Sequence, residues 1–112
     1  MLENAETVLY TQPEESIKIA DHILKNSSNT NQLIQANLLN TSAYYIKGEF
    51  ENAVKASVDA KILAESSGNI PMQLKAMVAS IPLLNHLGLD AVATQYFINT
   101  TVIAETLDTQ EA

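Results

Sequence analysis

The stretch KGEFENA at residues 47–53 is repeated forty residues later as LGLDAVA at residues 87–93, with Gly48 aligned to Gly88 and Ala53 to Ala93. The same offset continues through the flanking sequence in the pairs Ala36 and Ala76, Leu63 and Ile103, Ala64 and Ala104, and Ala20 and Ala60. A period of this length is typical of solenoid proteins, in which each repeat buries its apolar face against its neighbours. Because such arrays present extended binding surfaces, the repeat favours binding over catalysis.

The composition fits one folded domain. The chain has 112 residues, of which 46% are hydrophobic and 17% charged, and its net charge is −7. All six basic residues are lysines, and the last of them is Lys75. A nucleic-acid surface needs clustered Lys or Arg, so we expect no direct nucleic-acid binding. Without cysteine the chain has no disulfide or thiolate metal site, and we expect no cofactor.

The sequence contains no pattern for membrane insertion or secretion. Its longest mostly apolar run, residues 76–84, is interrupted by Ser80 and Pro82 and is far shorter than the roughly 20 residues that span a bilayer. The N-terminus is acidic, whereas a signal peptide begins with basic residues. We expect a cytoplasmic protein, or a periplasmic one if the chain is a piece of a longer membrane sensor.

Apolar residues recur at helical spacing and strand-like alternation is absent, which predicts an all-α fold. Six helices are expected, at residues 2–10, 13–26, 30–47, 49–66, 71–87 and 90–107. Gly48, the run at residues 67–69 and Gly88 would end the third, fourth and fifth helices. Thr30 or Asn31 is expected to cap the third helix and Asp90 the sixth.

The six helices predict a right-handed α-solenoid of about three helical hairpins. The repeats would span residues 1–28, 29–68 and 69–108 of a single domain, residues 1–112. Pro82 lies inside the fifth expected helix, where proline removes one backbone hydrogen bond, so we expect a kink there.

The run AYYIKGEFENA at residues 43–53 resembles a tetratricopeptide repeat. That family places an aromatic residue four positions before a glycine, an aromatic two after it, and small residues five and twelve after it. The matching residues here are Tyr44, Gly48, Phe50, Ala53 and Ala60. Glycine permits the tight turn between the helices and alanine lets them approach closely. The resemblance covers about residues 13–107, and it departs from the family in lacking tryptophan and in its longer period, since the family repeats every roughly 34 residues.

Longer repeats of this kind resemble those in bacterial sensory and regulatory proteins, namely peptide-regulated transcription factors and repeat-bearing regulators or histidine kinases of Bacteroidota. The run PEESIKIADHILK at residues 13–25 is similar to the opening repeat of the latter group. The resemblance implies a protein- or peptide-binding scaffold in a signalling protein or transcription regulator. The alternative is a structural self-association module whose groove holds no ligand.

In the tetratricopeptide-repeat family the first helix of each pair lines a concave groove. The alignment with that family implies that the groove residues here are Gln35, Ser42, Tyr45, Lys75, Asn85 and His86. Ordinary solvated polar positions are the alternative interpretation of these residues. The clamp with which some family members hold a partner's terminal carboxylates is missing, because Ser42 and Pro82 occupy its asparagine position.

No catalytic or metal-binding pattern stands out. His22 and His86 are the only histidines, and neither has the spacing of a metal site. The acidic pairs at residues 14–15 and 49–51 lie at expected helix starts, where the helix dipole accounts for them. We therefore expect that the protein is not an enzyme and binds no metal.

The sixth expected helix carries an apolar stripe that corresponds to one on the fourth. In the fourth expected helix, one stripe, formed by Ala53, Ser57, Ala60 and Ala64, should face the partner helix, and a second, formed by Val54, Val58 and Ile62, should be covered by the next helix. Forty residues later the second stripe becomes Thr94, Ile98 and Val102, with no further helix to cover it. We expect self-association, as a homodimer, through Ile98 and Val102.

Overall fold

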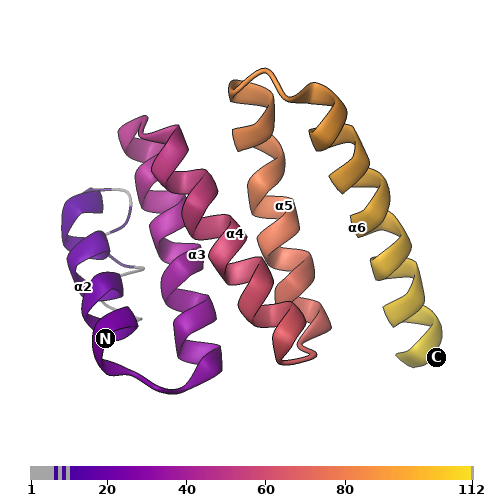
Figure 1. The fold of residues 1–112 in the computed structure, drawn as a ribbon, viewed down its shortest axis with the longest axis horizontal. Helices are drawn as coiled ribbons and strands as arrows, with labels where there is room; N and C mark the ends of the chain where they lie inside the picture. The colour runs from indigo at the N-terminus through magenta and orange to yellow at the C-terminus, as the bar shows by residue number, and fades with distance from the viewer. Residues whose placement is uncertain (1–6, 8, 10, 112) are drawn as a thin grey trace.

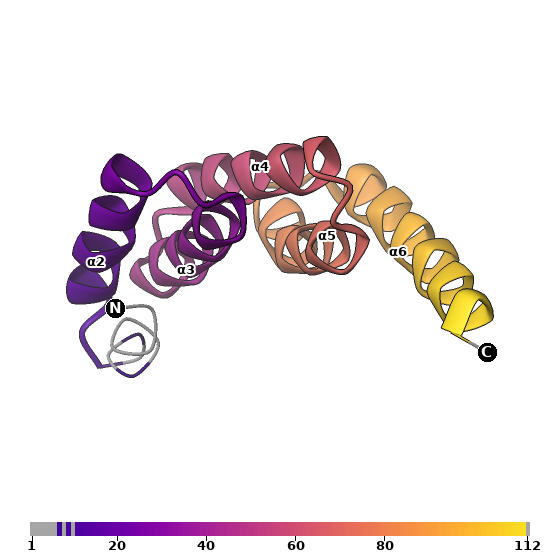
Figure 2. The same cartoon turned by 90° about the horizontal axis from the view of Figure 1, so that it is seen from below.

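The protein is a row of α-helices (Figure 1) that curves into an arch when it is seen from below (Figure 2). The computed structural model describes Thr7, Leu9 and residues 11–111, with side chains up to residue 106. Its helices are α2 (Pro13–Asn26), α3 (Thr30–Lys47), α4 (Phe50–Ser66), α5 (Ile70–His86) and α6 (Asp90–Glu111). The described residues contain no strand, so the all-α prediction is confirmed there. The helix expected at residues 2–10 lies outside the described residues, apart from Thr7 and Leu9.

The arch has two layers (Figure 2). Helices α2, α4 and α6 form the outer layer, and α3 and α5 lie beneath them on the inner side. Each helix packs against the next one in the chain, and α3 also touches α5. This consecutive packing is the arrangement expected of a helical-hairpin solenoid. The right-handed sense of the stack and the limits of the three repeats stay predictions.

The two glycines that the sequence repeat aligns lie in turns of the same geometry. Gly48 ends α3 with φ 80°, and Gly88 follows α5 with φ 75°. In both turns the glycine N–H donates to a carbonyl three residues back, and the next N–H donates to one five residues back, at 2.8 Å. A Cβ at either glycine would meet nothing within 4 Å, so the left-handed backbone itself requires glycine.

The helix caps differ from those expected. Asn29, not Thr30 or Asn31, caps α3, because its side-chain oxygen accepts the Gln32 N–H at 3.0 Å. Forty residues later, Asn69 accepts the Met72 N–H at 3.2 Å and caps α5 in the same way. Asn29 stands one residue before Thr30, the first of the two cap positions expected for this helix, whereas no cap was expected for α5.

The start of α6 also differs. Asp90 is its first helical residue and not its cap, since the first helical hydrogen bond runs from the Ala93 N–H to the Leu89 carbonyl, at 3.0 Å. The boundaries of three helices change accordingly: α4 begins at Phe50, α5 spans Ile70–His86, and α6 continues to Glu111.

Small side chains fill the spaces between helices. One cluster joins Ala20 and Ile23 of α2 to Ala36 and Leu39 of α3. A second joins Ile34, Ala60, Ala64 and Ala76 of α3, α4 and α5. Alanine at these contacts lets the helix axes approach closely, so the aligned alanines of the repeat form the core. The expected stripe of α4, Ala53, Ser57, Ala60 and Ala64, is fully buried.

The expectation that the next helix covers the second stripe of α4 is wrong. Val58 is 40% exposed and Ile62 53% exposed, although α5 follows α4 and packs against it. Both residues lie on the side of α4 opposite its alanine stripe, and therefore point away from the inner layer. A following helix consequently does not cover this stripe, which changes the interpretation of its counterpart on α6.

Candidate partner-binding surface

The two inner helices carry no carboxylate. The chain's 13 Asp and Glu residues lie on α2, α4 and α6, at Glu49 just before α4, and at Glu3 and Glu6. Helices α3 and α5 contribute only Lys47, Lys75 and His86 as ionisable side chains other than tyrosine. In a chain with net charge −7, the inner helices thus lack the negative charge that dominates elsewhere, and this distribution influences which partners can approach.

A pocket of about 300 Å³ lies between the two inner helices. It is lined by Thr41, Ser42, Tyr45, Ile46, Ala79 and Pro82. Val78 is 51% exposed and shares a face of α5 with Lys75 and Pro82, because residues three or four apart in a helix lie on one face. The pocket therefore continues into exposed apolar surface, and a mainly apolar hollow with a few polar groups is the usual form of a small binding site.

An aromatic cluster borders this surface at the end where α3 and α5 terminate. The rings of Phe50 and His86 stack with centroids 4.6 Å apart and an interplanar angle of 9°. Tyr45 meets both rings edge-on, and its hydroxyl lies 3.2 Å from His86 Nε2. The cluster joins α3, α4 and α5, so it fixes the spacing of the two inner helices beside the pocket.

The structure brings together three of the six expected groove residues. Ser42 and Tyr45 line the pocket, and His86 contacts Tyr45. Lys75 and Asn85 are exposed and Gln35 is half-buried, and none of these three lines the pocket. Whether any of the six contacts a partner stays a prediction.

The expected groove set leaves out four pocket residues, Thr41, Ile46, Ala79 and Pro82, although the family alignment gives Pro82 the same clamp position as Ser42. Ile46 follows Ser42 by four residues and Ala79 precedes Pro82 by three. Helical spacing from Ser42 and Pro82 could therefore have suggested Ile46 and Ala79. Thr41 is almost fully buried, and its hydroxyl donates to the Asn37 carbonyl at 2.9 Å, so no polar-surface pattern could have identified it.

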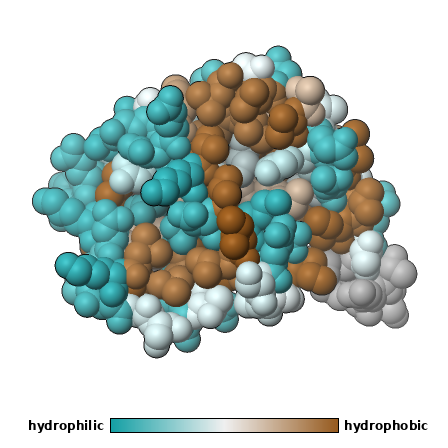
Figure 3. Space-filling model, in the orientation of Figure 1, coloured by the Kyte–Doolittle hydropathy of each residue, from teal (hydrophilic) through white to brown (hydrophobic). Residues whose placement is uncertain are grey.

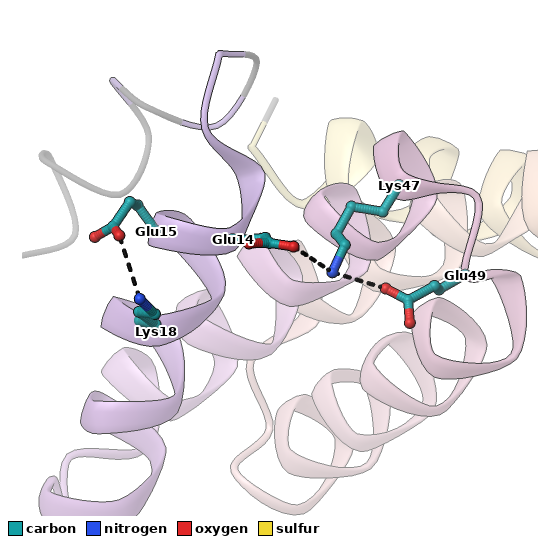
Figure 4. A network of polar contacts seen from close by, with 5 residues as sticks. All are labelled: Glu14, Glu15, Lys18, Lys47 and Glu49. Carbon is teal, nitrogen blue, oxygen red and sulfur yellow. Dashed lines mark hydrogen bonds and ion pairs between the residues drawn. The ribbon is translucent and has the colours of Figure 1, made fainter.

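Two larger hollows lie at the turns between repeats. One, of about 460 Å³, is lined by residues 11–15 and Lys47, and the other, of about 410 Å³, by residues 48–52 and Leu87. Lys47 forms ion pairs with Glu14 at 3.4 Å and with Glu49 at 3.0 Å (Figure 4). The hydrogen bond from its ammonium to Glu49 is the main cause that raises the pKa of Lys47. The Lys47–Glu14 pair thus joins two expected repeats at the first of these hollows, whereas the smaller pocket between α3 and α5 is mainly apolar.

A polar cleft of about 210 Å³ lies between α2, α3 and α4, and Asp21, Asn40 and Tyr44 are among its lining residues. The Asn40 amide donates to Asp21 at 3.0 Å, while its buried Oδ1 has no hydrogen-bond partner. Burial first, and then the charges of Asp21 and Glu49, raise the pKa of Tyr44. A cleft of this size with an unsatisfied amide oxygen beside it suits ordered water.

The outer layer carries its own apolar residues. Figure 3 shows the side on which α4 lies in front, where apolar groups alternate with hydrophilic ones. On α6, the expected self-association residues Ile98 and Val102 are 49% and 56% exposed. Their repeat counterparts Val58 and Ile62 are exposed to a similar degree, so the premise that a missing helix leaves Ile98 and Val102 bare is wrong.

A different residue marks the open side of α6. Ser57 is fully buried on α4, and its counterpart forty residues later, Phe97, is 62% exposed, the largest exposed fraction among the large apolar side chains of the described residues. Among the described helices, α6 packs only against α5, whereas α4 packs against both α3 and α5. Phe97 therefore occupies a position that neighbouring helices cover in the preceding repeat.

Comparisons with protein-family models, with curated proteins and with solved structures find no match to this chain. The tetratricopeptide-repeat resemblance thus depends on the residue pattern alone. Within the described part of the chain, no helix is long and apolar enough to cross a membrane. The same residues contain no group of three or more His, Cys, Asp or Glu side chains that could hold a metal ion.

Proposed function

We propose that this chain is a helical scaffold that binds a protein or peptide partner on the inner surface formed by α3 and α5. The observation that carries the proposal is the apolar pocket between two helices that have no carboxylate. An apolar hollow flanked by exposed Tyr45, Ile46 and Val78 gains free energy when a partner's apolar side chain covers it. The resemblance to bacterial sensory and regulatory proteins supports a role as the sensing region of a signalling protein or transcription regulator.

Two valines offer a matched test of this surface. Val78 lies on the inner face of α5 and Val58 on the outer face of α4, and they are 51% and 40% exposed. Random peptides displayed on phage would be selected for binding to the unmodified chain. The affinity of the selected peptides for each variant would then be measured. We expect Val78→Glu to abolish binding of the selected peptides and Val58→Glu to leave it unchanged, since only Val78 shares a helix face with the pocket residue Pro82. Peptides that ignore Val78→Glu, or that lose binding equally with both variants, would contradict the proposal.

Salt dependence separates this binding from non-specific attraction to the acidic outer helices. Basic peptides held by exposed carboxylates lose affinity as salt screens the charges. Binding to the carboxylate-free inner surface should change little between low and physiological ionic strength.

Self-association is the second candidate function, and the exposure of Phe97 favours it. A second copy that covers Phe97 would supply the packing that Ser57 has within the chain. This function would leave the inner surface without a ligand, so the two candidates differ in which surface a substitution must damage.

A further inference from the structure

Helix α5 continues through Pro82 although proline cannot donate a backbone hydrogen bond. In an α-helix the N–H of residue 82 would donate to the carbonyl of Val78, four residues earlier. The Val78 carbonyl therefore lacks its regular donor. It directly precedes Ala79, which lines the pocket together with Pro82 itself.

The surroundings of this carbonyl are open to a partner. Val78 is half-exposed and Pro82 is exposed, both on the inner face of α5. Carbonyls on the solvent side of a helix tilt outward, and a proline increases this tilt. An acceptor without its regular donor thus lies at the edge of an apolar hollow.

We infer that the inner surface selects an extended peptide segment that donates one backbone N–H to the Val78 carbonyl and places an adjacent apolar side chain in the pocket. This inference rests on the proposed peptide-binding function and specifies how that site recognises its partner. The segment is extended because the interior N–H groups of a helix are already bonded within the helix.

The charges of the inner helices restrict the sequence of this segment. A basic motif would find no carboxylate on α3 or α5, and Lys75 would repel it. Lys75 makes no ion pair among the described residues and can instead accept an acidic residue in the flank of the peptide. The recognised segment is therefore apolar at its centre and free of clustered Lys and Arg.

The test uses the random-library peptide that binds the unmodified chain most tightly and depends on Val78. Its backbone N–H groups are replaced one at a time by N-methyl groups, and affinity is measured by calorimetry for the unmodified chain and for Pro82→Ala. Alanine at position 82 supplies the missing N–H from within α5, and so occupies the Val78 carbonyl.

One N-methylation beside the apolar anchor should weaken binding to the unmodified chain by roughly two- to tenfold, the effect of one net hydrogen bond. The same N-methylation should have no effect on binding to Pro82→Ala. Any change in pocket shape in Pro82→Ala affects the parent peptide and its N-methylated form alike. Comparing the effect of N-methylation between the two proteins therefore isolates the hydrogen bond.

Equal effects of N-methylation in the two proteins would overturn the hydrogen bond to Val78 while leaving the peptide-binding surface intact. Selected peptides rich in Lys and Arg would overturn the apolar specificity. Failure to select any peptide that depends on Val78 would overturn the proposed function itself, and with it this inference.

Discussion

Lys47 forms two ion pairs with other described residues. Its ammonium pairs with Glu14 in the first turn of α2 and with Glu49 just before α4 (Figure 4). These pairs are solvent-exposed, so each adds little to stability at neutral pH. They nevertheless make the protonation of Lys47 part of the contact between neighbouring repeats.

The raised pKa of Lys47 predicts a pH dependence. Because its folded-state pKa lies above the ordinary value of 10.5, its contribution to stability is fully present below that value and is lost as pH rises through the folded pKa. The raised pKa of Tyr44 acts in the same direction above its ordinary value of 10.0. The free energy of unfolding, measured with urea from neutral pH to about pH 11, should fall less steeply in Lys47→Met than in the unmodified chain.

Lys55→Met is the control, because Lys55 makes no ion pair among the described residues. The free energy of unfolding of Lys55→Met should change with pH in the same way as that of the unmodified chain, from neutral pH to about pH 11. The interpretation would be wrong if Lys47→Met and Lys55→Met had the same alkaline profile.

Within α5, Pro82 is the cause of two features on the inner face of the helix. Pro82 contributes its ring to the pocket and removes the donor of the Val78 carbonyl. The helix absorbs this loss without a break, because the packing of Ala76, Met77, Leu83 and Leu84 holds it on both sides of the proline. The sequence also predicts that the axis of α5 bends at Pro82, and this bend stays a prediction.

We expect Pro82→Ala to raise the free energy of unfolding by up to about 3 kcal/mol, because alanine restores a hydrogen bond and removes the clash of the proline ring. Pro71→Ala in the first turn of α5 is the matched control and should give no such gain, since a first-turn proline costs no hydrogen bond. Urea unfolding of both variants measures the difference. A loss of stability in Pro82→Ala would mean that the ring's contacts outweigh the missing bond.

For the whole molecule, the arrangement of helices separates two surfaces with different chemistry. The inner helices α3 and α5 enclose a mainly apolar pocket and carry no carboxylate, whereas the acidic residues lie on the outer helices, at Glu49 just before α4, and at Glu3 and Glu6. The open side of α6 forms a third surface, at which Phe97 occupies the place of a buried serine. Self-association and partner binding can therefore be tested independently.

We predict concentration-dependent self-association through the side of α6 that carries Phe97, because covering this ring removes apolar surface from water. Light scattering should show a smaller association constant for Phe97→Ser, whereas the double variant Ile98→Glu with Val102→Glu, on the other side of α6, should leave association unchanged. Val58→Glu with Ile62→Glu makes the same change forty residues earlier and should leave association unchanged. A monomer at every concentration, or an equal effect of the α4 pair, would remove the prediction.

The sequence by itself determined the helices and the turns that join them. Helix α2 spans the expected residues, and the glycines at 48 and 88 end helices as expected, because backbone hydrogen bonds and left-handed glycine conformations depend on residues within about five positions. The stacking of these helices also followed from sequence, since alanines recurring every forty residues can be buried only between helices.

Only the tertiary structure decided which side chains remain uncovered. Ser42 and Ala79 share one pocket, Val58 stays exposed beside α5, and Phe97 is exposed where Ser57 is buried. Each of these results depends on how far a helix is rotated about its axis against the neighbouring helices. That rotation is set by the combined packing of several helices, and a one-dimensional hydrophobic pattern gives the period of a helix face without identifying what covers it.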